Sequence, residues 1–466
     1  MRVLHLSTWD MEGGAARSCH RLHAGLRRLG VRSRLLCLNR TSQDPDVIRA
    51  WDLLPPQAGR RADLLLRAAT AWVLRQRTAA SDSLFSPAIP SPPLADLAPV
   101  AEAQILNLHW VARLADATTL CRLARLGKPL FWTLHDMWPF SGGCHFAAGC
   151  EGFATDCGLC PQLAPEAHDL PRRTLAERVD ALAGAEITVI CPSRWLTGLA
   201  ARSRLFRDQR VLTVPYGLDT TLYRPLPKAK AKRLLGIAPG TTLLAFSAFS
   251  LAERRKGMAL LAQALALCAQ DPAFRRDAEA GRIMGLCCGQ GGSPTIPGLP
   301  VMNLGYLADE RLLALFLAAA DVYVMPSVED NLPNTILEAM ACGTAVAGFD
   351  AGGVPDLVDH GETGLLVPAP PVNSVIAAPP GIPGLAATGW DIAVPPSLVP
   401  SVSALAEQIL RLSQDPALRR RMGLAARAKV VAEYDLEVQA TRYNRLYAEA
   451  LKATRPDARP PKPSGR

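Results

Sequence analysis

The residues best suited to chemistry stand together in one stretch, 326–343, with the sequence PSVEDNLPNTILEAMACG. A short β-rich run precedes this stretch, Pro333 suits the first turn of a helix, and Gly343 suits its end. The pattern therefore predicts a strand that gives way to a helix starting near residues 331–333. Polar and acidic side chains occupy the turn between them, which is typical of a ligand-binding turn.

The expected helix start suits a phosphate. The amides of residues 332–335 would lack intrahelical partners, and the partial positive charge of a helix N-terminus favours an anion. Asp330 stands just before the helix, and Glu338 lies roughly 7.5 Å past Pro333 along its axis at about 1.5 Å per residue. A nucleotide diphosphate sugar spans that distance, with its sugar at Asp330 and its ribose at Glu338. The alternative is that Asp330 merely interacts favourably with the helix start and that Glu338 lies on a solvated face of the helix.

The elements that must position this stretch alternate in type along the chain. Strand-like and helix-like runs over 3–7, 15–29 and 33–38 follow one another, which predicts an α/β protein with a parallel sheet and crossover helices. Between the first strand and helix, Gly13 and Gly14 would let the backbone approach a ligand. An ordinary strand-to-helix turn is the alternative.

Two further positions belong to this pattern. The strand-like run 129–135 ends in His135, at the edge where open α/β sheets carry their sites, although a histidine there is often structural. In the second half of the chain, Lys256 and Gly257 head an amphipathic helix after the strand-like run 242–246. The simpler interpretation of this pair is an ordinary surface lysine next to a glycine. The functional interpretation is a loop that binds an anion.

Together these motifs resemble the retaining glycosyltransferases of family 4, which have the GT-B fold of two Rossmann-like domains facing across a cleft. The resemblance covers roughly residues 1–40 and 100–450. Its motifs are an acid after Pro-Ser with a second Glu eight residues on, Thr-x-His at 133–135, Lys-Gly at 256–257, and V-P-x-G-x-D at 214–219.

The resemblance implies a role for individual residues. His135 would face the reacting end of the donor sugar, Asp330 would contact that sugar, and Glu338 would hold the ribose hydroxyls. Lys256 would neutralise the donor diphosphate as negative charge grows there. The implied catalytic residues are His135, Lys256 and Asp330, and the implied donor-binding residues are Gly13, Gly14, Arg255, Lys256, Asp330, Asn331, Leu332, Pro333, Asn334 and Glu338.

The chain departs from the family pattern at two points. Asp330 is followed by Asn-Leu-Pro-Asn rather than a glycine-rich turn, and Glu329 stands next to it, so either carboxylate is a candidate for the sugar contact. An arginine often stands six residues before the lysine in the family, where this chain has Ser250. Arg254 or Arg255 is the expected substitute.

A linker-like run at 211–225 divides the chain near its middle. The expected parts are an acceptor-side Rossmann-like domain over 1–215, a nucleotide-sugar domain over 216–430, a helix over 431–453 that crosses back to the first domain, and a basic flexible tail over 454–466. Insertions are expected at about 44–100 and 368–400, with a cysteine-rich loop at 144–160.

Cys144, Cys150, Cys157 and Cys160 have the spacing C-x5-C-x6-C-x2-C. Disulfides do not persist in the cytosol, so the alternatives are a metal site or scattered reduced thiols. Four soft ligands suit a closed, structural zinc site. No metal or other cofactor is expected for catalysis, because the resemblance implies that the donor's own phosphate accepts the acceptor's proton.

The amino-acid composition limits the kinds of binding partner that we expect. The 466 residues are 49% hydrophobic and 20% charged, as in globular proteins, and their net charge of +9 favours an anionic partner. No basic-aromatic motif indicates nucleic acid. The N-terminus suits a first strand rather than a secretory signal, and no apolar run reaches the ~18 residues of a membrane helix. We therefore expect a cytoplasmic protein, with peripheral contact to an acidic membrane surface at its cytoplasmic face.

The sequence thus predicts retaining transfer of a sugar from a nucleotide diphosphate sugar to a polysaccharide or lipid-linked glycan acceptor. Neither half carries a complete GxGxxG dinucleotide fingerprint with its following acid, which disfavours an oxidoreductase. The alternatives are a nucleotide-sugar epimerase or phosphorylase on the same fold, and a catalytically silent binding subunit. The departures at Ser250 and Asp330 are the best argument for the silent subunit.

Overall fold

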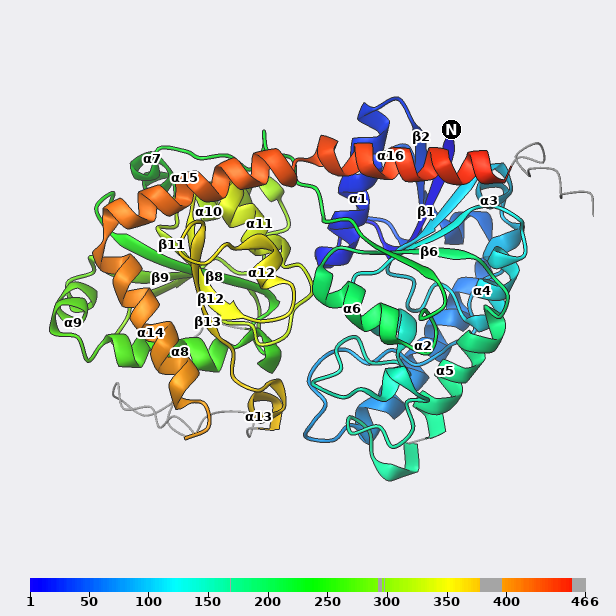
Figure 1. Ribbon diagram of the computed structural model, residues 1–466, viewed down its shortest axis with the longest axis horizontal. Coiled ribbons are helices and arrows are strands. Elements are labelled where there is room, and N and C mark those ends of the chain that lie inside the picture. The colour runs from blue at the N-terminus through cyan, green and yellow to red at the C-terminus, as the bar shows by residue number, and fades with distance from the viewer. Residues whose placement is uncertain (168, 292–295, 297, 378–395, 455–466) are drawn as a thin grey trace, which may run out of the picture.

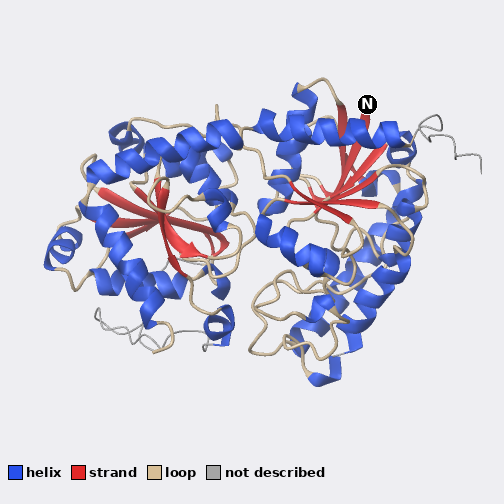
Figure 2. Ribbon diagram, in the orientation of Figure 1, coloured by secondary structure: helices blue, strands red, loops and turns tan. Residues whose placement is uncertain are grey.

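The computed structural model describes residues 1–167, 169–291, 296, 298–377 and 396–454. These residues form two α/β units side by side, each built around its own parallel sheet (Figure 1). Helices cover both faces of each sheet, as Figure 2 shows. The predicted α/β class with two Rossmann-like domains is therefore confirmed.

The N-terminal sheet has seven strands in the order β3-β2-β1-β4-β5-β6-β7, and every neighbouring pair is parallel. Its strands are apolar runs because both faces are covered; in β1, Val3, Leu4 and Leu6 are all buried. The strands are β1 Arg2–Trp9, β2 Arg32–Asn39, β3 Val47–Arg49, β4 Ile105–Leu108, β5 Leu130–Thr133, β6 Ile187–Cys191 and β7 Arg210–Thr213.

The helices of this unit start where the sequence supplies a cap. The side chain of Asp116 accepts from the amide of Thr119, and that of Ser193 accepts from the amide of Leu196. The helices are α1 Gly13–Arg28, α2 Pro56–Gln76, α3 Ala98–Glu102, α4 Ala117–Ala124, α5 Asp169–Ala181 and α6 Arg194–Arg202.

The expected insertion at 44–100 is partly integrated into the domain. Its strand β3 pairs with β2 and forms the edge of the sheet, so the first residues of the segment belong to the Rossmann-like core. The long helix of this segment is α2, Pro56–Gln76. The short 3₁₀ helices η1 Ala50–Leu53 and η2 Leu94–Asp96 complete the segment.

The C-terminal sheet has six strands in the order β10-β9-β8-β11-β12-β13, again all parallel. The strands are β8 Thr242–Ser250, β9 Ile283–Gln290, β10 Val301–Asn303, β11 Val322–Met325, β12 Ala345–Asp350 and β13 Gly364–Pro368. The helices are α7 Lys228–Leu234, α8 Met258–Cys268, α9 Pro272–Glu279, α10 Glu310–Ala319, α11 Asn334–Ala341, α12 Val354–Leu357, α13 Val372–Ala377, α14 Val399–Gln414 and α15 Pro416–Glu433.

The last helix, α16 Leu436–Ala453, leaves the second unit and lies along α1 of the first (Figure 1). Its Tyr447 hydroxyl accepts a hydrogen bond from Asn107 at 2.7 Å, and its Tyr443 hydroxyl lies 3.0 Å from the hydroxyl of Thr133. Both tyrosines are fully buried. The predicted return of the C-terminal helix to the first domain is confirmed.

The chain passes from the first sheet to the second between β7 and β8, where the sequence predicts the boundary at 215/216. Helix α7 packs against α10 and so belongs with the second unit. Of the proline-rich insertion predicted at about 368–400, residues 378–395 lie outside the described residues, as do residues 455–466 of the predicted tail. No helix in the described part of the chain is long and apolar enough to cross a bilayer.

Candidate active site

The stretch 326–343 forms the turn and helix that its sequence predicts. Strand β11 ends at Met325, the turn carries Asp330, and α11 begins at Asn334 behind its N-cap residue Pro333. Close contact with a second loop holds this turn. A Cβ on Gly352 would lie 1.9 Å from the carbonyl oxygen of Asp330, so only glycine fits there.

Lys256 and Asp330 form an ion pair beside the start of α11. The Lys256 Nζ donates to Asp330 Oδ2 at 2.6 Å. Burial would raise the pKa of Asp330, but the charges of Lys256 and Arg255 outweigh burial and lower the pKa. The loop that carries Lys256 sits directly on this turn, because a Cβ on Gly257 would lie 1.9 Å from the carbonyl oxygen of Pro326. The structure therefore brings two of the predicted catalytic residues together.

Arg254 and Arg255 point to different partners. Arg255 Nη1 donates to the Glu329 carbonyl at 2.9 Å and lies 3.9 Å from Asp330 Oδ1. The Arg254 side chain turns away, and its Nε donates to Asp82 Oδ1 of the N-terminal domain at 3.2 Å. Of the two substitutes expected for the arginine missing at Ser250, Arg255 is the one beside the site.

Glu329 and Asp330 face different ways. The Glu329 carboxylate accepts from the amide of Ala148 in the N-terminal domain at 3.2 Å, whereas Asp330 faces Lys256. Burial raises the pKa of Glu329 to about 7, despite the nearby charge of Arg255. Asp330 is therefore the acid engaged by the lysine, and Glu329 is the acid engaged across the domain boundary.

The asparagines of the turn connect α11 to the first domain. Asn331 accepts from Ser193 Oγ at 2.6 Å and donates to the carbonyl oxygen of His135 at 3.0 Å. Asn334 Nδ2 donates to the Gly14 carbonyl at 3.1 Å. Gly13, with a φ of 85°, turns the chain into α1 so that this carbonyl faces α11. The predicted glycine turn thus meets the predicted donor-binding turn.

Leu332 fills the base of the turn and is buried in the apolar core of the second domain. Glu338 is also buried, and its carboxylate accepts from Arg21 Nη2 at 2.7 Å. Burial raises the pKa of Glu338, with Arg21 acting in the opposite direction. Arg21 also binds Glu310, with its Nε 3.1 Å from Glu310 Oε1. The residue expected at the ribose is therefore tied to the other domain.

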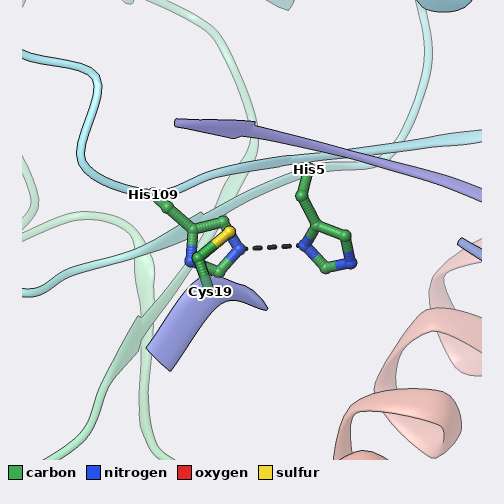
Figure 3. Close-up of side chains that lie close together, drawn as sticks. All are labelled: His5, Cys19 and His109. Carbon is green, nitrogen blue, oxygen red and sulfur yellow. Dashed lines mark hydrogen bonds between the residues drawn. The ribbon is translucent and has the colours of Figure 1, made fainter. Parts of the chain in front are cut away.

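His135 belongs to a chain of hydrogen bonds inside the first domain. Its Nε2 lies 3.1 Å from His109 Nδ1, and its Nδ1 lies 2.8 Å from the Tyr216 hydroxyl. His109 Nε2 in turn lies 2.9 Å from His5 Nδ1 (Figure 3). Burial lowers the pKa of His135 to about 4, which makes the ring neutral at pH 7. Both ring nitrogens are engaged, so a sugar hydroxyl that binds the ring must replace one of these partners.

The same figure shows Cys19 against this pair. Among the described residues, His5, Cys19 and His109 form the group whose ligand atoms all lie within 4.8 Å of one another. The hydrogen bond between His5 and His109 accounts for the two imidazole nitrogens that face each other. We therefore interpret this group as a buried hydrogen-bonded pair of histidines with a neighbouring cysteine, and not as a metal centre.

Sequence reasoning missed Arg21, His5 and Tyr216 as parts of the site. For Arg21 there is a signal, because it lies on the buried side of α1 between Cys19 and Leu22, where an apolar residue is expected. For His5 the signal is weak, since a histidine inside a buried strand has many structural explanations. The cysteine-rich loop lies next to this region through Ala148.

The comparisons fit this geometry. Residues 240–379 match the family described as Glycosyl transferases group 1. A D-inositol 3-phosphate glycosyltransferase of Actinosynnema mirum is 32% identical over 187 residues, which cover 37% of this chain and 42% of that protein. The chain thus spans less than half the length of this curated relative.

Solved structures match over nearly the whole chain. Sucrose-phosphate synthase of Thermosynechococcus elongatus has a TM-score of 0.59 over 97% of this chain and 100% of its own, at 20% identity. Anabaena HepE in complex with UDP and glucose has a TM-score of 0.60 over 96% and 99%, at 16% identity. At such identities the likeness shows the fold alone, and the GT-B architecture predicted from the sequence is confirmed.

Proposed function

We propose that this chain, which contains a group 1 glycosyltransferase domain at residues 240–379 within a GT-B fold, transfers a sugar from a nucleotide diphosphate sugar to a polysaccharide or lipid-linked glycan with retention of configuration. The observation that carries the proposal is the cationic pair Lys256 and Arg255 at the start of α11, with buried Glu338 further along the same helix. The binding of UDP and glucose by HepE supports a donor of this kind.

Lys256 and Arg255 would stabilise the leaving diphosphate. When the bond between the anomeric carbon and the diphosphate oxygen breaks, its electron pair stays on that oxygen, and nearby fixed cations stabilise the added charge. Asp330 keeps Lys256 in place at 2.6 Å and remains ionised because its pKa is lowered. The donor diphosphate would share or replace this contact.

The acceptor would complete the reaction from the face on which the diphosphate leaves. Its hydroxyl oxygen bonds to the anomeric carbon, and its proton passes to the phosphate oxygen that has just been released. Attack and departure on one face retain the anomeric configuration. No protein carboxylate has to act as base in this sequence, so the ion-paired state of Asp330 is compatible with turnover.

Glu338 would take the ribose of the donor. A buried carboxylate that accepts two hydroxyl donors replaces the hydrogen bonds that the ribose loses from water. Arg21 binds the same carboxylate at 2.7 Å, from the other domain. Ribose binding would thus depend on how the two domains sit together.

Helix α2 supports a peripheral contact with an acidic membrane at the cytoplasmic face. Leu64 and Leu74 are 69% and 57% exposed on this helix. Arg60 and Arg61 are exposed on the same helix. Exposed apolar side chains beside cationic ones are typical of helices that lie on anionic lipid surfaces. A lipid-linked acceptor would be delivered at such a surface.

Calorimetric titration with nucleoside diphosphates and their sugars tests the donor assignment. We expect saturable binding that is weakened both in Lys256→Ala and in Glu338→Gln. Product analysis with and without acceptor then separates a transferase from an epimerase, which needs no acceptor, and from a phosphorylase, which consumes phosphate. Tight donor binding without any turnover would favour the silent subunit, and absence of donor binding in the folded protein would overturn the proposal.

A further inference from the structure

We propose that Cys144, Cys150, Cys157 and Cys160 bind one structural zinc ion that fixes the loop beside the active site. All four lie in the segment between β5 and α5, close to the carboxyl edge of the N-terminal sheet. The proposal does not depend on sugar transfer, because it concerns how this loop is held.

The four cysteines line one small, almost wholly apolar cavity. Its walls include Phe85, Phe153 and Pro171, and no carboxylate lines it. A site with four thiolates and no oxygen ligands favours zinc in a closed tetrahedron with Zn–S distances of about 2.3 Å. No three of the four sulfurs lie within 4.8 Å of one another, a limit that His5, Cys19 and His109 meet among the described residues. Zinc binding would therefore draw the sulfurs inward into the cavity they share.

Backbone amides already point at two of the four sulfurs. Cys157 Sγ accepts from the amide of Gly142 at 3.2 Å, and Cys150 Sγ accepts from the amide of Gly152 at 3.4 Å. Amide donors that face sulfur stabilise thiolates and orient them around a metal. Scattered structural thiols do not need such donors.

The turn between the last two cysteines is strained. Cys157 and Leu159 have φ values of 56° and 53°, in the left-handed region that residues with a Cβ rarely adopt. Such conformations persist when the surroundings fix them. Coordination of Cys157 and Cys160 by one ion would supply that constraint.

A buried cation, Arg178, lies near the cysteines and forms no close ion pair with a carboxylate among the described residues. The Arg178 guanidinium donates to the carbonyl oxygens of Trp138 and Ser141 at 2.5 and 2.8 Å, and its Nη2 has no hydrogen-bond partner in the described part of the chain. Ser141 lines the cavity of the cysteines, so this guanidinium lies close to the proposed site. A zinc ion with four thiolates carries a net charge of about −2, which would offset this buried arginine.

Zinc at this point would join two parts of the domain. Cys150 and Cys157 border the main apolar core of the first domain, whereas Cys144 and Cys160 belong to a separate small cluster with Phe85 and Val73. A small cluster of this kind is stabilised by a covalent or metal link to a larger core. The ion would thus attach the rim of the domain, including α2, to its core.

The loop that zinc would hold also reaches the second domain. Between Cys144 and Cys150, the Phe146 ring lies 3.7 Å from the Arg255 guanidinium carbon, and the amide of Ala148 donates to Glu329 at 3.2 Å. Metal binding would therefore position the contacts of the first domain with Arg255 and Glu329. Loss of the ion should loosen one wall of the proposed donor site.

Metal analysis of the full-length, tag-free protein, expressed with zinc and purified under reducing conditions without chelator, tests the proposal. We expect about one zinc per chain, falling below roughly a tenth in Cys157→Ser/Cys160→Ser. Cys121→Ser is the matched control, because Cys121 is half-buried on α4 outside the cavity and should leave the zinc content unchanged.

If the double variant does not fold, replacement of the metal in the parent protein by Co²⁺ provides a second test. A tetrahedral four-thiolate site should give strong sulfur-to-cobalt charge-transfer absorption and intense d–d bands. Zinc content near zero in the parent, iron in place of zinc, zinc retained by the double variant, or a cobalt spectrum without thiolate bands would each overturn the proposal.

Discussion

Replacement of Glu338 by Gln should remove the preference of the protein for an intact ribose. The carboxylate is buried and would accept from both ribose hydroxyls, so its loss should cost about 1.5 to 3 kcal/mol of donor binding. That energy corresponds to roughly tenfold to 150-fold weaker affinity. Arg21 would lose its partner at 2.7 Å but keep Glu310 at 3.1 Å. Stability should therefore fall by less than the ~3 to 5 kcal/mol of a fully broken buried pair.

Calorimetry with UDP and with 2′,3′-dideoxy-UDP separates ribose recognition from a general effect. The parent should bind UDP more tightly than the dideoxy compound, and Glu338→Gln should bind the two alike. Glu310→Gln is the matched control, because it also removes a partner of Arg21 but lies at the start of α10. It should keep the preference. If Glu338→Gln keeps the preference of the parent, the donor site has been misplaced and the residue roles drawn from the resemblance are wrong.

The remaining predictions concern charge, pH and lipid. Lys256→Ala should lower kcat by about 10²-fold or more and also weaken donor binding, because its partner charge grows in the transition state; an unchanged kcat would contradict this. Burial raises the pKa of Glu329 to about 7 from 4.5, so its stabilising effect is complete below pH 4.5 and lost as pH rises to 7. Glu329→Gln should therefore melt above the parent at pH 8 and close to it at pH 4.5, and an equal difference at both pH values would refute the assignment. Leu64→Glu/Leu74→Glu should reduce sedimentation with anionic vesicles, whereas Leu424→Glu, equally exposed on α15, should not.

The periodicity of apolar residues and the residue types at turns were enough to predict most of the fold. Alternating apolar runs predicted the parallel sheets, since strands covered on both faces need buried side chains throughout, as β1 has. The segment 44–100 was harder, because β3 has only three residues and its membership of the sheet depends on pairing with β2. A strand that short has no periodic signal of its own.

For the candidate site too, local motifs were predictable from the sequence, whereas contacts between distant residues were not. Asp330, Lys256 and Glu338 lie on local motifs, so their spacing along the chain was informative. The partner of Glu338 was not predictable, because Arg21 lies 317 positions away and meets it only after two domains dock. Likewise, the sequence left open whether Glu329 or Asp330 contacts the sugar, because the direction of a side chain in a loop cannot be predicted from its position in the chain; in the structure Asp330 faces Lys256. Arg254 and Arg255 are adjacent and both backbone amides bind Asp82, yet the Arg254 side chain also binds Asp82 whereas the Arg255 guanidinium approaches Asp330.

The most direct test of the central claim is proton NMR of the protein with a panel of nucleotide diphosphate sugars, with and without glycan acceptors. The account predicts that at least one donor is consumed with release of the nucleoside diphosphate, and that the new glycosidic bond has the anomeric configuration of the donor. Lys256→Ala should slow that signal strongly under the same conditions. A product of inverted configuration would contradict the account. So would folded protein that consumes none of the donors in the presence of the acceptors.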